Sequence, residues 1–246
     1  MTAPGPRRGR WLLRQPAPDA ESRLFCFPYV GTGASMFHAW PRRIGPVEVC
    51  PIQLPGRENR MREPGCQTYG ELIDGLVPFL APSLDRPYGL FGHCSSAFLG
   101  FETARRLVDM GLPPPARLIV SSMVPPHQPR FGAILQVAEE DLGRETEAMM
   151  RARGLEPTPD ILEVAVAAMR DDVRAYRRYQ GVPAACPLPF PVTVLAWAGD
   201  TYVDAGWTAG WAAYGEVRRV VLDGDHWSFL APPPAMLTEI ERDLAA

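Results

Sequence analysis

The stretch Gly89-Leu90-Phe91-Gly92-His93-Cys94-Ser95-Ser96-Ala97-Phe98 places a glycine and a potential nucleophile between an apolar run and a segment with helical spacing. Residues 87–91 have the composition of a buried strand, and residues 95–110 mix apolar and charged positions as a helix does. This order is that of a nucleophile elbow, G-x-S-x-G, in which a tight turn lifts a reactive side chain above a parallel sheet. Two positions differ from that pattern, since Cys94 replaces the serine and Ser96 replaces the second glycine.

Length and composition favour a single α/β domain. The 246 residues can bury a large core, and the formal net charge of -3 gives no reason to expect binding to nucleic acid or to a membrane. Five cysteines without C-x-x-C spacing and the lack of an apolar run of about 18 residues predict a reduced, cytoplasmic protein. The four scattered histidines predict no metal site, and no cofactor is expected. Residues 1–10 are expected to be a disordered lead-in, and residues 11–246 to form the domain.

Alternating apolar runs and helical patterns predict the order of elements. Strands are expected at 24–29, 48–54, 87–91, 117–122, 191–197 and 216–222, and helices at 35–43, 68–80, 95–110, 205–214 and 233–245. About residues 123–191 contain two helical segments and no convincing strand, so this region is predicted to be a helical lid inserted over the site. Strands alternating with helices imply a mostly parallel sheet with helices on both faces and functional residues at the carboxyl ends of the strands.

Two later strand ends carry the residues that a nucleophilic cysteine requires. Asp200 follows the fifth expected strand and His226 follows the sixth, which gives the chain order nucleophile, acid, histidine. A thiol needs a neighbouring base to become a thiolate near neutral pH, and the base needs a carboxylate that fixes its tautomer. We therefore predict a catalytic triad of Cys94, His226 and Asp200. Asp204 is an alternative acid, and Asp225 is a less plausible one.

An oxyanion hole made of backbone donors would complete such a site. In an elbow of this layout one donor is the N–H of Ser95, directly after the nucleophile. The other comes from the loop after the first strand, around Val30. Because backbone groups do the binding, side-chain substitutions in this loop would leave the oxyanion hole intact.

Further motifs extend over residues 11–245. The loop Cys26-Phe27-Pro28-Tyr29-Val30-Gly31 and the segment Gln53-Leu54-Pro55-Gly56-Arg57-Glu58 with Arg60 are similar to F-P-x-A-G-G and P-G-R-E-x-R. Residues 92–94, Gly-His-Cys, are similar to G-H-S, and residues 199–200 and 224–230 are similar to G-D-x-D and G-G-H-F-x-L. Together these motifs resemble those of the type II thioesterases of polyketide and nonribosomal peptide synthesis, which are free-standing α/β-hydrolases.

The chain departs from the family pattern at several positions besides the nucleophile. Tyr202 stands where the second acid of G-D-x-D would be, so the identity of the catalytic acid stays open between Asp200 and Asp204. Val30 replaces an alanine and Thr32 a glycine near the expected oxyanion hole.

The resemblance implies a thioesterase that acts on acyl groups carried as phosphopantetheine thioesters on acyl or peptidyl carrier proteins. The reaction would pass through an acyl-Cys94 intermediate that water hydrolyses. A cysteine nucleophile exchanges one thioester for another, so the acyl-enzyme stays activated. An acyltransferase or cyclase that passes the acyl group to an amine, alcohol or thiol is therefore a close alternative, and an inactive scaffold that binds the carrier protein is a second one.

Several side chains could contact the acyl group or the carrier protein. Met123, Trp227 and Phe229 are candidate lining residues of an acyl pocket, although any single one of them is rather expected to pack in the core. Arg57, Arg60 and Arg62 could meet an acidic carrier surface, lie in a solvated loop or form internal salt bridges.

Overall fold

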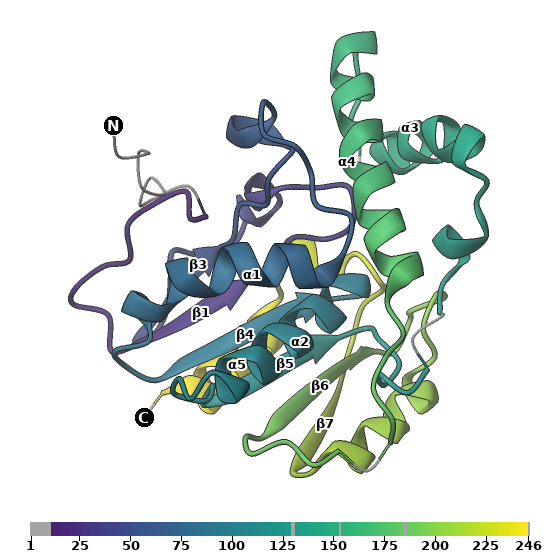
Figure 1. The fold of residues 1–246 in the computed structure, drawn as a ribbon. Helices are drawn as coiled ribbons and strands as arrows, with labels where there is room; N and C mark the ends of the chain where they lie inside the picture. Colours follow the sequence, from purple (N-terminus) through teal and green to yellow (C-terminus); the bar gives the residue numbers. More distant parts are fainter. Residues whose placement is uncertain (1–10, 129–130, 153, 185, 246) are drawn as a thin grey trace, which may run out of the picture.

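A single seven-stranded sheet organises the protein in the computed structural model, which describes residues 11–128, 131–152, 154–184 and 186–245 (Figure 1). Its strands are β1 (Ser22–Cys26), β2 (Arg43–Ile44), β3 (Val47–Pro51), β4 (Tyr88–His93), β5 (Arg117–Ser121), β6 (Val192–Trp197) and β7 (Val217–Leu222). The order across the sheet is β2-β3-β1-β4-β5-β6-β7, and every neighbouring pair is parallel except β2 with β3. The predicted mostly parallel α/β sheet is thereby confirmed. The expected lead-in at 1–10 lies outside the described residues.

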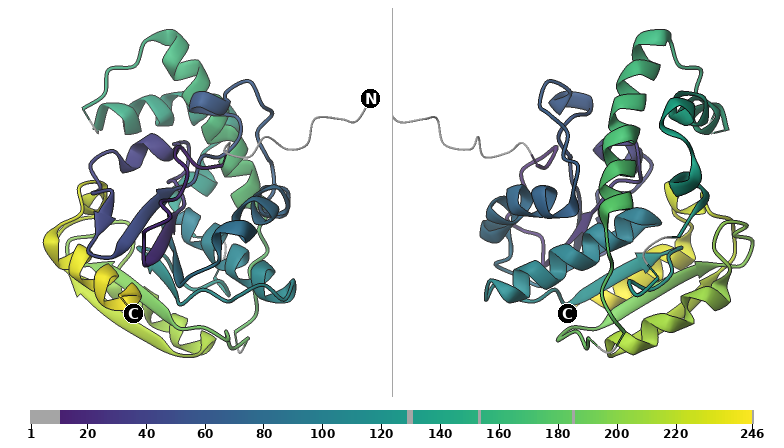
Figure 2. Two further views of the ribbon diagram at one scale, coloured as in Figure 1. Left: turned by 90° about the vertical axis from the view of Figure 1, so that its left-hand side faces the viewer. Right: turned by 45° about the vertical axis from the view of Figure 1, so that its right-hand side comes forward.

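Helices cover both faces of the sheet (Figure 2). They are α1 (Tyr69–Leu80), α2 (Ser95–Asp109), α3 (Leu142–Ala152), α4 (Pro159–Arg178) and α5 (Pro234–Leu244), with 3₁₀ turns that include η1 (Ala34–Phe37) and η6 (Ala205–Tyr214). Neighbouring strand residues point to opposite faces. Phe25 belongs to the core beneath α1 and α2, and the preceding Leu24 belongs to the core beneath α5. Each face of the sheet is therefore buried, as expected for a parallel sheet.

Two predicted helices differ from the structure. The helix expected at 35–43 is only the short turn η1, followed by β2, because Pro41 and Gly45 (φ 55°) bracket a segment that pairs with β3. The segment 205–214 forms a 3₁₀ helix. Its buried residues Thr208, Trp211 and Tyr214 are spaced three apart, which matches three residues per turn.

The chain between β5 and β6 forms the helical insertion, defined here as residues 123–191. Its described residues contain α3 and α4 and no strand. The two helices pack against each other, and the ribbon shows them rising beyond the ends of the strands (Figure 1). None of the helices in the described ranges has both the length and the hydropathy needed to cross a membrane.

The junction of β4 and α2 brings two backbones very close together at Gly92. A Cβ at this position would lie 2.6 Å from both N and Cα of Ala97, and closer still to the carbonyl oxygen of Ser96. Backbone atoms cannot rotate away as a flexible side chain can. Only glycine therefore allows the strand to turn directly into the helix here.

Replacing Gly92 with alanine should destabilise the protein by about 1–3 kcal/mol or more, because the added methyl group overpacks a rigid junction. The measurement is the free energy of unfolding from urea titration. Gly143→Ala is the matched control, because Gly143 lies in α3 with no atom near its would-be Cβ. That variant should be neutral or slightly more stable. Equal losses in the two variants would contradict this account of the junction.

Candidate active site

Cys94 lies in a strained turn between β4 and α2. Its φ of 54° and ψ of -133° are rare for any residue other than glycine. The turn is held by the N–H of Cys94, which donates to the carbonyl of Ser121 (2.9 Å), and by Ala97 N–H, which donates to the carbonyl of Cys94 (2.9 Å). The thiol is free and half-buried. This is the geometry that presents a side chain at the carboxyl edge of the sheet.

Ser96, which replaces a glycine of the elbow pattern, is accommodated inside the turn. Its hydroxyl donates to the carbonyl of His93 (2.9 Å) and accepts from the N–H of His93 (3.0 Å). The extra side chain therefore satisfies backbone groups of the turn.

His226 and Asp200 meet at the same edge of the sheet. His226 Nδ1 donates to Asp200 Oδ2 (3.0 Å), and both side chains are almost fully buried. Burial alone would lower the pKa of His226, but hydrogen bonds with Asp200 and Cys94 outweigh it and raise the pKa to about 9. The imidazole thus lies between a carboxylate that fixes its tautomer and the thiol at the elbow.

Asp200 is held by several donors in addition to His226. Oδ2 accepts from the hydroxyl of Ser122 (2.7 Å), and Oδ1 accepts from the N–H groups of Tyr202 (2.8 Å) and Val203 (3.0 Å). Burial would raise the pKa of Asp200, but the hydrogen bonds from His226 and Ser122 lower it below its usual value. Asp200 is therefore an ionised, oriented partner for the imidazole.

The two other acids considered for this role make local contacts. Asp204 caps η6, where its Oδ1 accepts from the N–H of Gly206 (2.7 Å). Asp225 closes a turn by accepting from the N–H of Trp227 (2.9 Å) and the hydroxyl of Ser228 (2.9 Å). Neither carboxylate has a hydrogen bond to His226, so the geometry favours Asp200.

His93 is a member of this cluster that was not among the site residues predicted from the sequence. Its ring is fully buried, stacks on Phe229 (3.8 Å between centroids), and places Nε2 3.3 Å from Nε2 of His226. Burial and the neighbouring His226 hold the pKa of His93 well below its usual value, so the ring is neutral. Its Nδ1 contacts the hydroxyl of Ser121 (2.9 Å).

The contact between the two Nε2 atoms needs one proton, and either ring can supply it. The raised pKa of His226 favours the imidazolium, whose Nδ1–H donates to Asp200 and whose Nε2–H can donate to Nε2 of the neutral His93. Nδ1–H of His93 then donates to the hydroxyl oxygen of Ser121, which also accepts from the indole N–H of Trp197 (3.1 Å). The sequence does place His93 at the end of a strand, directly before Cys94, which could have pointed to a place in the site. A lone sequence gives no sign of its partner 133 residues away.

The expected oxyanion donors are the N–H of Ser95, the residue directly after Cys94, and the N–H of Val30, in the loop four residues after the end of β1. No acceptor among the described residues is bonded to the N–H of Val30 or of Ser95, although Val30 and Ser95 are themselves buried. Both N–H groups are therefore uncommitted within the described residues. The next residue, Gly31, donates its N–H to Asp172 of α4 (2.7 Å).

Comparison with known proteins assigns the chain to a family. Residues 22–244 match the family model described as the thioesterase domain. The chain belongs to the thioesterase family. It is 33% identical over 243 residues to a probable cadicidin biosynthesis thioesterase from Streptomyces griseus, a match that covers 96% of this chain and 66% of that protein.

Solved structures of related thioesterases have the same fold. The type II thioesterase BorB of the borrelidin biosynthetic cluster superposes with a TM-score of 0.80 at 27% identity, covering 97% of this chain and 99% of that one. RedJ, a thioesterase of the prodiginine pathway in Streptomyces coelicolor, gives a TM-score of 0.75 at 33% identity, covering 92% and 87%. The α/β-hydrolase fold and the resemblance to type II thioesterases are thereby confirmed.

A large cavity in the thioesterase lies between the helical insertion and the loops that follow β1 and β3. Its volume is about 710 Å³, and its wall is mostly apolar, with Met36, Met61, Met150 and Met169 among the lining residues. It reaches Gly31, next to the expected oxyanion donor, and Leu230, four residues after His226, but Cys94 does not line it. Methionine side chains adapt to ligands of varied shape, so this cavity suits a flexible apolar chain.

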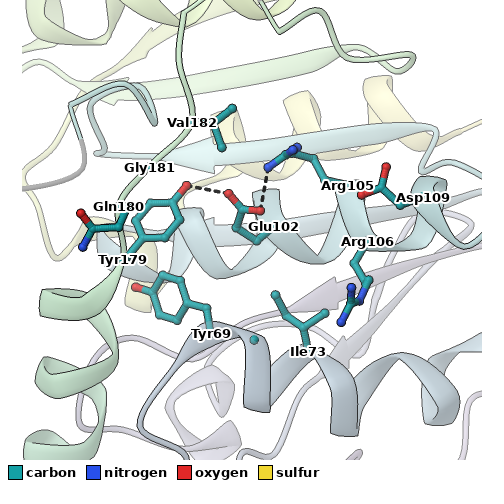
Figure 3. Close-up of a pocket in the computed structure, with 11 residues that line it drawn as sticks. Tyr69, Ile73, Glu102, Arg105, Arg106, Asp109, Tyr179, Gln180, Gly181 and Val182 are labelled. Carbon is teal, nitrogen blue, oxygen red and sulfur yellow. Dashed lines mark hydrogen bonds and ion pairs between the residues drawn. The ribbon is translucent and has the colours of Figure 1, made fainter.

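A second cavity, of about 330 Å³, lies where α1 and α2 meet the chain that follows α4 (Figure 3). It is bounded by α1, α2 and the end of α4. Within it Glu102 accepts from the hydroxyl of Tyr179 (2.8 Å) and pairs with Arg105 (2.9 Å). Glu102 and Arg105, two of the charged residues that line this cavity, thus pair with each other.

Two of the three candidate pocket residues are core residues. Met123 is fully buried, and Phe229 is buried against His93, and neither lines the cavity of about 710 Å³. Trp227 is half-buried next to His226, with ring centroids 5.1 Å apart. The cavity wall comes instead from α3, α4 and the loops, which a pattern of single residues could not show.

The arginines of the P-G-R-E-x-R motif mostly point inward. Arg57 pairs with Asp172 (2.6 Å) and Arg60 with Glu63 (2.7 Å), and both guanidinium groups are buried. The suggestion that Arg57 and Arg60 meet a carrier surface is therefore wrong, and the alternative of internal salt bridges is correct. Arg62 is exposed.

The raised pKa of His226 makes the stability of the protein depend on pH. A histidine whose pKa is higher in the folded state than its usual 6.5 stabilises the fold fully below pH 6.5. That stabilisation is lost as the pH rises through about 9. The difference in free energy of unfolding between the wild type and His226→Gln should therefore shrink from pH 6.5 to 9, measured by urea titration. A difference that is constant or grows over this range would contradict the assigned pKa direction.

Proposed function

We propose that this thioesterase hydrolyses acyl groups held as phosphopantetheine thioesters on acyl or peptidyl carrier proteins, through an acyl-Cys94 intermediate. The contact of His226 with Asp200, beside a cysteine in a strained elbow, is the observation that carries the proposal. The relatives named for cadicidin, borrelidin and prodiginine biosynthesis support the substrate class. The inactive-scaffold alternative is disfavoured, because a scaffold needs neither a strained elbow nor an oriented imidazole.

In the first step the sulfur of Cys94 attacks the thioester carbonyl. His226 takes the thiol proton, and Asp200 stabilises the resulting imidazolium. The tetrahedral oxyanion accepts hydrogen bonds from the N–H groups of Val30 and Ser95. When it collapses, the pantetheine sulfur leaves and takes the proton from His226, so one thioester has been exchanged for another.

In the second step water attacks the acyl-Cys94 carbonyl. His226 takes a proton from that water and returns it to the sulfur of Cys94, which releases a carboxylic acid and restores the enzyme. The acyl chain itself is proposed to occupy the cavity of about 710 Å³ beneath the insertion. Transfer to an amine, alcohol or thiol is the second candidate, because acyl-Cys94 is still a thioester and is reactive toward these acceptors.

Intact mass measurement during incubation with an acyl-loaded carrier protein tests the proposal. The wild type should gain the mass of one acyl group and lose it again in water, whereas Cys94→Ala should gain none. An adduct that persists until an amine or alcohol is added would replace hydrolysis by transfer. Labelling that survives in Cys94→Ala would contradict the assignment of the nucleophile.

Matched substitutions of Asp200 and Asp204 test which of the two is the catalytic acid. Asp200→Asn should lower kcat/KM on the order of 10³-fold, because an amide cannot stabilise the imidazolium and favours the wrong tautomer. Asp204→Asn should change kcat/KM by no more than a few-fold, since Asp204 only caps η6. Steady-state assays with the same acyl thioester make the comparison. The reverse order of losses would reassign the acid.

A further inference from the structure

Asp172, on the inner face of α4, reaches the loop that follows β1. Its Oδ2 accepts from the N–H of Gly31 (2.7 Å) and from Nη1 of Arg57 (2.6 Å), and its Oδ1 accepts from Nη2 of Arg57 (2.7 Å). The same Arg57 donates to the carbonyl of Thr32 (2.9 Å). One carboxylate and one guanidinium thus bind the loop from two directions.

The loop held in this way carries the expected oxyanion donor. Val30 precedes Gly31, so fixing the N–H of Gly31 fixes the plane of the peptide that joins the two residues. Thr32 N–H returns to the carbonyl of Tyr29 (3.0 Å), which closes the turn around Val30. With Gly31 and Thr32 anchored, the Val30 N–H keeps one direction without needing a partner of its own.

Helix α4 also packs directly on this loop. Gly31 has a φ of 72°, and a Cβ there would lie 2.7 Å from the terminal carbon of Met169, which is one helical turn before Asp172. Burial lowers the pKa of Arg57, but its ion pair with Asp172 outweighs this and raises it. Arg57 therefore stays charged and cancels the charge of Asp172. An unpaired carboxylate this close would oppose negative charge in the oxyanion hole.

We propose that Asp172 and Arg57 are positioning residues for the oxyanion hole, so that the hole has its active geometry only while α4 is seated on the core. This inference rests on the proposed function. It assigns a role in acylation to the helical insertion and to the arginine of the P-G-R-E-x-R motif. Neither residue is proposed to touch the reacting atoms.

The cysteine nucleophile allows a test that a serine enzyme would not offer. Attack on a thioester needs the oxyanion hole, whereas alkylation by iodoacetamide needs only a reactive thiol at Cys94. The two second-order rate constants are measured for the wild type, Asp172→Asn and Asp172→Ala. Acylation uses hexanoyl-N-acetylcysteamine with acid quench and intact mass, and alkylation is quantified by peptide mapping at Cys94.

Acylation should slow by about tenfold or more in Asp172→Ala, and less in Asp172→Asn, whose amide oxygen can still accept from Gly31. Alkylation should change by less than twofold in both. Asp171→Ala is the control, since its carboxylate lies on the same helix but packs against Gly65, and it should leave both rates unchanged.

The other outcomes each overturn the inference in a distinct way. Equal losses of acylation and alkylation in Asp172→Ala would show a merely structural role. Acylation at the wild-type rate in that variant would show that the loop is held without the ion pair, with the proposed function intact. A wild type that is alkylated at Cys94 but never acylated would refute the proposed function and this inference together.

Discussion

The structure depends on the close approach of two backbones at Gly92. Because no side chain fits between β4 and α2 at this point, the chain turns within a single residue, and Cys94 is forced to a positive φ. The cost of that conformation, on the order of 1–3 kcal/mol, is offset by the rigid sheet and helix on either side. The position of the Cys94 side chain is therefore set by backbone contacts, so a cysteine can stand where the elbow pattern has a serine without remodelling the turn.

Sheet topology then brings the partners of Cys94 to the same edge. β1 and β4 are neighbours at the point where the strand order reverses, and ligands of open α/β sheets bind at such points. The loop after β1 supplies Val30, and the ends of β5 and β6 supply Ser122 and Asp200. His226 comes from the loop after β7. Residues from five parts of the chain therefore converge without any of them being close in sequence to the next.

Much of this arrangement was accessible from the sequence. The strands were predictable because each is an apolar run bounded by turn residues. Cys94, Asp200 and His226 could be picked out as candidates because each follows one of these strands, in the order nucleophile, acid, histidine. Asp204 could not be separated from Asp200 by sequence, because both follow the same strand, and only the hydrogen bonds show which carboxylate faces the imidazole. The contact of His93 with His226 and the pairing of Arg57 with Asp172 depend on how distant elements pack, which no local pattern encodes. The 3₁₀ conformation of η6 was not predicted, because buried residues three positions apart also fit the i, i+3 spacing of an α-helix.

The place of Met169 on α4 has a thermodynamic consequence. Its side chain lines the large cavity and presses on Gly31, and the same helix face carries Asp172. A chain that fills the cavity would therefore favour the seated helix, and by reciprocity a seated helix would favour the chain. If the acyl chain occupies this cavity as proposed, such linkage would make the catalytic rate, as well as the affinity, depend on the length of that chain.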